Sequence, residues 1–326
     1  MKNGQKNTIK IVFLFIGLII FSIISVFLFP TPLDVNMEIG KFFHIIVNIR
    51  LPEVLIGIMA GACLGLAGAI MQIVLNNSLA SPFTLGISAA AAFGAALSIC
   101  IESYLAILWI PPGLSAFIFS VISIFLLIFL ISFSGISKKN IILIGMSINF
   151  FFNASNTVLQ YFASPDAVYQ IAFWTTGSLT VSSLKDSFFL FAILLISISI
   201  SLLFSKDLGI IQQGEKNAVM HGVNVNLERF VFLFISSLLA SCTVSIVGII
   251  GFIGLVAPHI SRLLNLESPK NLLLSSVLIG AILLLGADIF SKTIIYPTIL
   301  PISAITSFFG IPLLLFLLFF KRKNNK

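Results

Sequence analysis

The sequence predicts an all-α, polytopic membrane protein with about ten transmembrane helices. Of its 326 residues, 59% are hydrophobic and only 9% are charged, and the mean hydropathy is +1.16. Soluble domains carry roughly a quarter charged residues, so this chain has too few polar side chains to cover a core that contains 33 phenylalanines. Its polar segments are short, which predicts one membrane domain over residues 1–326.

The apolar segments define the expected spans. A helix that crosses about 30 Å of hydrocarbon needs about 20 mostly apolar residues. The first segment follows three lysines, but its long apolar run and the lack of a small-residue cleavage site favour a retained span over a signal peptide. The eighth is short and contains Pro258. The ten expected spans are residues 10–29, 53–75, 85–104, 112–134, 140–162, 187–205, 230–249, 252–265, 272–290 and 303–320.

The basic residues predict the orientation, because Lys and Arg accumulate in cytoplasmic loops. With ten spans and both termini in the cytoplasm, only Lys41, Arg50, Lys185 and Lys292 of the 18 basic residues lie outside. This topology also explains the net charge of +7 and the pI near 9.4 without any nucleic-acid partner. The basic residues assigned to the inside are Lys2, Lys6, Lys10, Lys138, Lys139, Lys206, Lys216, Arg229, Arg262, Lys270, Lys321, Arg322, Lys323 and Lys326.

Two polar segments between spans are expected to contain short helices. The longest stretch on the inner side is 205–229, and its part GEKNAVMHG (214–222) predicts a short helix that ends at Gly222, a residue suited to a C-cap. On the outer side, 164–179 predicts a partial helix at the membrane interface, anchored by Tyr169 and Trp174.

The chemistry that an enzyme, a metalloprotein or an ion-driven carrier needs is scarce. The histidines His44, His221 and His259 are scattered, with no HExxH, so we expect no metal site. There is no GxSxG and no GxxxxGK[ST], which leaves no expected catalytic residue and no phosphate loop. The acidic candidates for ion coupling, Glu53, Glu102 and Asp288, stand near span ends. The three cysteines, Cys63, Cys100 and Cys242, each stand alone in apolar sequence and are interpreted as small core residues.

Small residues are dense in GIMAGACLGLAGAIMQ (57–72) and GISAAAAFGAAL (86–97). Helices in lipid associate through close approach at Gly, Ala and Ser. The second and third spans are therefore expected to pack tightly.

Several ordered motifs resemble one transporter family. The stretch GFIGLVAPHISRLL (251–264) is similar to a signature of FecCD/BtuC-like permeases, the subunits that import ferric siderophores, haem and cobalamin in bacterial ATP-binding cassette (ABC) systems. The block RLPEVLIGIMAGACLGLAGAIMQIVLNNSLASPFTLGIS (50–88) resembles another part of the family pattern. Counterparts of WTTGSL (174–179), LLGADIFSK (284–292) and FFGIPLLLFLL (308–318) follow in order. The resemblance implies the type II ABC importer permease fold.

The resemblance also implies site residues. Asn77 and Leu79 match positions that narrow the cytoplasmic exit of the pathway, and the short helix in 205–229 matches the segment that contacts the ATPase. Arg50 and Lys292 match exposed outer positions that pair with carboxylates of the binding protein, although Glu53 stands where the family usually has a second basic residue. Pro258, placed at the start of the signature helix, is followed by His259 and Arg262 on one face. The ATPase-coupling residues are Glu215, Ala218, His221 and Gly222.

The resemblance implies transport of an iron chelate, most often a ferric siderophore, with haem, cobalamin and molybdate as alternatives. The implied partners are a second permease copy or paralogue, a cytoplasmic ATPase dimer, an extracytoplasmic substrate-binding protein and membrane lipid, with no cofactor in this chain. The implied location is the bacterial cell membrane. The competing hypotheses are a self-sufficient ion-coupled carrier, which lacks the expected intramembrane acids, and a membrane enzyme, which lacks a polar cluster.

Overall fold

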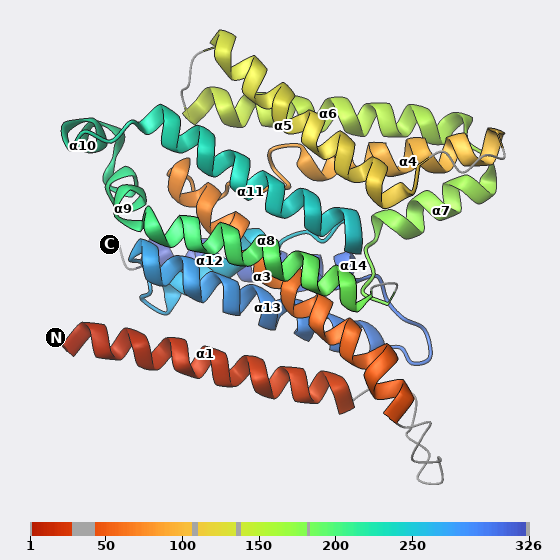
Figure 1. Cartoon of the computed structure of the whole chain (residues 1–326), viewed down its shortest axis with the longest axis horizontal. Helices are drawn as coiled ribbons and strands as arrows, with labels where there is room; N and C mark the ends of the chain where they lie inside the picture. Colours follow the sequence, from red (N-terminus) through yellow and green to blue (C-terminus); the bar gives the residue numbers. More distant parts are fainter. Residues whose placement is uncertain (1, 28–42, 106–109, 135–137, 181–182, 324–326) are drawn as a thin grey trace.

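The computed structural model describes residues 2–27, 43–105, 110–134, 138–180 and 183–323, and these residues form helices and connecting turns without any β-strand. Many of the long helices run lengthwise along the elongated structure, and α3 and α5 cross it obliquely (Figure 1). Eight of them are long and apolar enough to cross a membrane.

All ten expected spans coincide with helices. These are α1 (Lys2–Phe27), α3 (Leu51–Val74), α4 (Ile87–Leu105), α5 (Pro112–Ser134), α6 (Lys138–Phe162), α8 (Leu184–Leu203), α11 (Val225–Val247), α12 (Ile253–Leu263), α13 (Pro269–Thr293) and α14 (Ile302–Lys323). A π-helical turn, η1 (Ile46–Arg50), leads directly into α3. The expected first span extends to residue 29, and residues 28 and 29 lie outside the described part of the chain.

Helix α12 differs from a full span. With 11 residues it rises only about 17 Å, roughly half of the hydrocarbon thickness. Pro258 lies inside this helix and does not begin it, so the expected helix start at Pro258 is wrong. The count of ten crossing segments stays a prediction.

Three shorter helices connect the long ones: α7 (Pro165–Thr175), α9 (Ser205–Gln213) and α10 (Glu215–Met220). The expected helices in 164–179 and 214–222 are confirmed, and Gly222 adopts the positive φ of 77° that suits a residue after a helix. Helix α9 was missed because its nine residues combine charges, two glutamines and a glycine, without a clear apolar period.

Helix α3 lies at the centre of the bundle. Every residue from Ala60 to Leu75 is buried, and α3 packs against α8, α11, α12 and α13. Its glycines let these neighbours come very close: a Cβ atom added at Gly61 would lie 2.4 Å from the carbonyl oxygen of Gly280, and one at Gly65 would lie 2.1 Å from that of Ser276. The tight packing expected for 57–72 is therefore confirmed, with α13 as the main partner.

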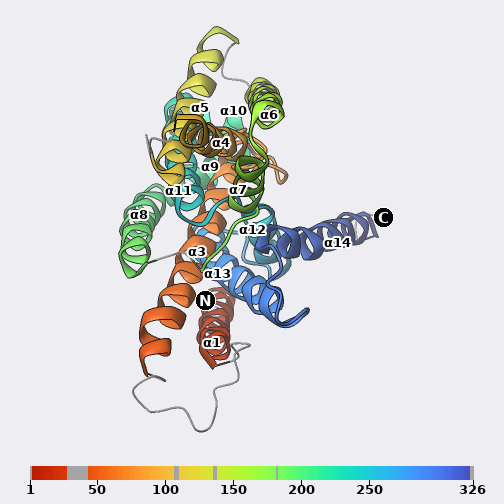
Figure 2. The same cartoon turned by 90° about the vertical axis from the view of Figure 1, so that its right-hand side faces the viewer.

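The second small-residue segment packs elsewhere. Helix α4 lies against α5 and α6, and Gly94 allows the carbonyl oxygen of Ser115 within 2.5 Å of the position that a Cβ would take. Helix α14 makes few contacts and projects sideways from the body (Figure 2).

The two ends of the bundle hold different features. The start of α1, the end of α3, α9 and α10 lie at one end (left in Figure 1), which we call the α10 end. The start of α3, the end of α13 and α7 lie at the other end, which we call the α7 end.

Candidate functional site

At the α10 end, a tight turn follows α3 and carries Asn77 and Leu79. The backbone N–H of Asn77 donates to the carbonyl oxygen of Gln72 (3.1 Å), and the N–H of Leu79 donates to Oδ1 of Asn77 (2.9 Å). The amide side chain of Asn77 is thus used to shape the turn, as Asn does in Asx-turns. The side chain of Leu79 is 53% exposed in the single chain, so an apolar group stands free beside the end of α3.

The signature helix α12 lies beside this turn. Nε2 of His259 donates to the carbonyl oxygen of Ser78 (2.9 Å), and Nη1 of Arg262 donates to Oε1 of Gln72 (2.6 Å). The amide nitrogen of Gln72 in turn donates to the carbonyl oxygen of Leu255 in α12 (3.2 Å). His259 and Arg262 therefore contact the turn that carries Asn77 and Leu79 and the last turn of α3.

Pro258 has a structural consequence within α12. Because proline has no N–H, the carbonyl oxygen four residues earlier, that of Gly254, has no helical donor from residue 258. This oxygen lies 1.7 Å from the position that a Cβ at Gly68 would occupy. Only a glycine at position 68 leaves room for the carbonyl, so α12 and α3 touch backbone to backbone at this point.

The predicted coupling segment forms a small folded unit at the α10 end. Helices α9, α10 and the start of α11 share an apolar core in which Ile211, Ala218 and Val225 are buried. The side chain of Ala218 therefore faces this core and is fully buried. The expected role of Ala218 in ATPase coupling stays a prediction. The exposed apolar groups of α10 are Val219 and Met220, the latter 81% exposed.

Arg229 connects this unit to the bundle. Its side chain is buried in α11, and Nη2 lies 3.5 Å from Oε2 of Glu215 at the start of α10. Glu215 is half exposed, and the exposed His221 ring is hydrogen-bonded through Nδ1 to the carbonyl oxygen of Asn217 (2.8 Å). Gly214 and Gly222 both have positive φ, 129° and 77°, and flank α10 on either side.

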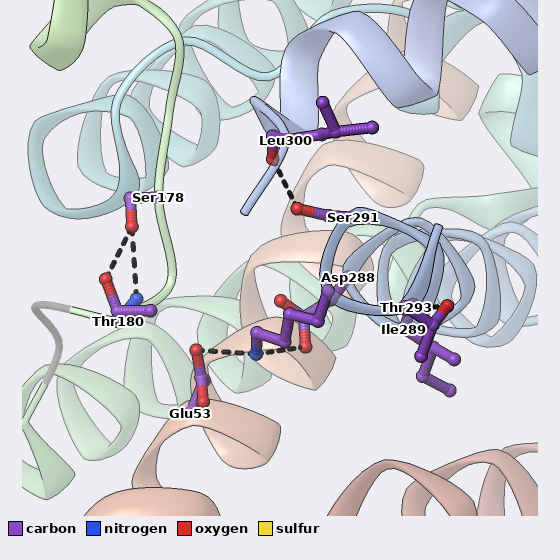
Figure 3. A network of polar contacts seen from close by, with 9 residues as sticks. Glu53, Ser178, Thr180, Asp288, Ile289, Ser291, Thr293 and Leu300 are labelled. Atoms are coloured by element: carbon purple, nitrogen blue, oxygen red, sulfur yellow. Dashed lines mark hydrogen bonds and ion pairs between the residues drawn. The ribbon is translucent and has the colours of Figure 1, made fainter. Parts of the chain in front are cut away.

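At the α7 end, the three residues assigned to docking are buried. Nζ of Lys292 lies 2.6 Å from Oε1 of Glu53 and 2.7 Å from Oδ2 of Asp288, between the two carboxylates (Figure 3). Lys292 is 5% exposed and Glu53 3% exposed. Arg50 is fully buried, and its Nη1 donates to the carbonyl oxygen of Val26 (2.9 Å). The expectation that Arg50 and Lys292 are exposed is wrong: Lys292 is buried between two carboxylates, and the Arg50 side chain is buried with Nη1 bonded to a backbone carbonyl oxygen.

Sequence reasoning did not assign Gln72, Met220 or Arg229 to these sites, and it named Asp288 only as a candidate for ion coupling. The spacing of Asp288 and Lys292 (i, i+4) was a usable signal, because such residues are neighbours on a helix. Arg229 was counted only toward the topology, and nothing in the sequence shows that its side chain is buried against Glu215. Among the described residues, no three His, Cys, Asp or Glu side chains cluster as metal ligands.

The architecture is that of a multi-pass membrane protein: a tightly packed helical bundle with the short helix α10 exposed at one end. Comparisons with known proteins give the family. The FecCD transport family model matches residues 13–320, so the chain belongs to the FecCD transport family and is a transmembrane permease subunit of an ABC importer.

Curated relatives match over most of their length. The Fe(3+)-citrate import system permease protein YfmE of Bacillus subtilis is 35% identical, with 99% of this chain and 98% of the relative covered. The hemin transport system permease protein HmuU of Yersinia pestis is 34% identical, with 87% of this chain and 85% of the relative covered. A solved ABC transporter of the metal-chelate type in an inward-facing conformation superposes with a TM-score of 0.85 at 31% identity, covering 95% of this chain and 98% of the other.

Proposed function

We propose that this permease carries an iron chelate, most often a ferric siderophore, that a substrate-binding protein delivers. Two copies, or one copy and a paralogue, form the pathway, and a separate ATPase dimer supplies the energy. The chain itself needs no cofactor and no nucleic acid. Relatives named for Fe(3+)-citrate, hemin, iron chelatin and siderophore support this ligand class, and a relative named for molybdate keeps that anion as an alternative together with cobalamin.

The ligand is tested by uptake. Vesicles that contain the permease, its ATPase and its binding protein should accumulate ⁵⁵Fe presented as a siderophore complex when ATP is inside. Unlabelled siderophore complex should compete, whereas molybdate, haem and cobalamin should not. Competition by one of these three alone would replace the ferric siderophore as the proposed ligand.

The location proposed is the bacterial cell membrane, with both termini in the cytoplasm and the α10 end facing it. The basic residues support this orientation, because Lys6, Lys206, Lys216 and Lys270 are exposed and flank the starts of α1, α9, α10 and α13. The projecting helix α14, with the exposed Phe308 and Phe309, supports pairing with a second permease chain.

The observation that carries the ATPase contact is the shape of α10. This helix buries one small residue, Ala218, and exposes two apolar side chains, Val219 and Met220, at the surface. Exposed apolar side chains on a short projecting element are typical of interface anchors. Its salt bridge to the buried Arg229 connects it to α11, so force on α10 is passed to a long helix of the bundle.

We expect Met220→Asp to lower ATP-driven uptake about tenfold or more, because a well-buried interface anchor contributes about 2 kcal/mol or more and a carboxylate in its place is desolvated. Uptake and ATP hydrolysis are measured on the same vesicles, and Met220→Leu is the matched control that keeps the apolar contact. Wild-type uptake by Met220→Asp would rule out this contact. A bulky charged side chain at Ala218 is expected instead to displace α10 from its small apolar core, because Ala218 is buried there.

We expect Leu79→Ala to increase the leak of a trapped fluorescent dye from proteoliposomes about severalfold, because two copies of this exposed leucine would seal the cytoplasmic exit across the dimer axis. Leu263→Ala removes an equally exposed leucine at the end of α12 and serves as the control. An unchanged leak in Leu79→Ala with intact uptake would reject the gate.

The alternative function is an ion-coupled carrier. Uptake that persists without any ATPase and collapses with the proton or sodium gradient would favour it. The position of Glu53 and Asp288, both engaged with Lys292, leaves these acids poorly placed for ion binding.

A further inference from the structure

Helix α12 is fixed in place at several points. Its backbone touches α3 at Gly68 and Gly254. Its end is capped: Nζ of Lys10 in α1 donates to the carbonyl oxygen of Leu264 (2.7 Å), a favourable position for a cation. Asn265, with φ of 56°, follows in the left-handed conformation that ends many helices. Helix α12 is therefore held firmly in place and can support the turn that follows α3.

Two hydrogen bonds connect α12 to the turn after α3 and to the last turn of α3. His259 holds the carbonyl oxygen of Ser78, which stands between Asn77 and Leu79, and Arg262 holds the side chain of Gln72, whose own carbonyl oxygen accepts from Asn77. Gln72 is buried and bonded to α12 at both ends of its amide group. The two contacts connect residues 181 and 190 positions apart in the sequence.

We propose that His259 and Arg262 are positioning residues for the turn at 76–80: they hold its backbone against α12 and so fix where the Leu79 side chain stands. Only the functional consequence of this inference rests on the proposed gate. The mechanical part, which is the effect of the two residues on the conformation of the turn, does not depend on the gate. Without His259, the Ser78 carbonyl loses its donor. Without Arg262, Oε1 of Gln72 loses its partner, and only the bond from Nε2 to Leu255 still connects this side chain to α12.

The mechanical part is tested by amide hydrogen exchange of the permease in lipid nanodiscs together with its ATPase. His259→Leu should speed exchange of the amides at 76–80 about three- to tenfold, the effect of one lost hydrogen bond of ordinary strength. His259→Gln keeps an N–H donor and should restore slow exchange. His44→Leu makes the same chemical change at an exposed histidine outside the site and should leave the turn unchanged.

Arg262→Met should have the same local effect, which Arg262→Lys should largely restore. The double variant His259→Leu with Arg262→Met should exceed either single variant. Exchange in the buried part of α3, residues 60–71, should stay slow throughout, because a positioning role is confined to the turn. Unchanged exchange at 76–80 in His259→Leu, or a rise across α3 and α13 together, would overturn the proposal.

The functional consequence is tested by dye leak from proteoliposomes. His259→Leu and Leu79→Ala should each increase the leak, and their combination should add less than the sum, because both act on the same side chain. If Leu79→Ala alone does not leak, the gate fails and the exchange result decides the positioning role by itself. If Leu79→Ala leaks and His259→Leu does not, the positioning role is overturned.

Discussion

Gly68→Ala is expected to destabilise the folded permease at or above the upper end of the roughly 1–3 kcal/mol that overpacking usually costs. The added methyl group would lie 1.7 Å from the carbonyl oxygen of Gly254 and 2.4 Å from its carbonyl carbon. Both atoms belong to the backbone, so no side-chain rotation relieves the clash. Helix α12 must move away from α3, and the contacts of His259 and Arg262 with the turn at 76–80 should weaken with it.

Thermal unfolding in detergent and the yield of monodisperse protein measure this effect. Gly286→Ala is the matched control on α13, because its new methyl group would meet only Cε1 of Phe21 at 3.5 Å, an ordinary contact. The control should unfold near the wild-type temperature, and Gly68→Ala well below it. Equal unfolding temperatures for the two variants would show that the backbones of α12 and α3 are not in close contact at Gly68.

The fold followed from the sequence because lipid imposes a simple rule. Long apolar segments must be helices, since the bilayer offers no other partner for backbone N–H and C=O groups. Every expected span therefore coincided with a helix. The weak point was α12, where Pro258 was read as a helix start. Proline is tolerated inside this helix because Gly68 leaves space for the carbonyl oxygen that Pro258 frees, and such a tertiary fit is invisible in one sequence.

The candidate sites followed only in part, because side-chain direction depends on packing. Leu79, expected to narrow the cytoplasmic exit, has an exposed side chain, and its role as a gate stays a prediction. Ala218 and Met220 lie two residues apart on the same short helix, yet one is buried and the other exposed. Arg50 and Lys292 were both predicted to lie outside. The structure brings them to the same end of the bundle, but the predicted topology does not say whether a charge faces water or its own chain.

Lys292→Met is the second change with a large expected effect. Lys292 is the cation between Glu53 and Asp288, at 2.6 and 2.7 Å, and all three side chains are buried. Removing one partner of a buried ion pair costs about 3–5 kcal/mol, because the remaining charges are left without compensation in a medium of low dielectric constant. Here two carboxylates would remain, so we expect a marked fall in the unfolding temperature.

Recovery of the unfolding temperature in a neutral variant tests the cluster more sharply than the loss of stability in Lys292→Met. Adding Glu53→Gln and Asp288→Asn to Lys292→Met removes both uncompensated carboxylates and should restore part of the stability, because a neutral set of similar volume often replaces a buried ion pair at little cost. The recovery should be incomplete, because the buried Arg50 then loses the attraction of Glu53. Lys185→Met, at an exposed lysine, is the control and should have no effect on unfolding. Failure of the neutral triple variant to regain stability would mean that the cluster is not the reason for the loss.

The same variants decide whether Lys292 also serves docking. A lysine held by two carboxylates of its own chain has little charge to offer a partner, so the neutral triple variant should bind the substrate-binding protein with wild-type affinity across a salt series. A docking lysine would behave differently. Lys292→Met would then weaken binding most at low ionic strength, where exposed charge pairs are least screened, and the neutral triple variant would fold normally but stay weak. That result would show that Lys292 serves docking in addition to its place in the buried cluster.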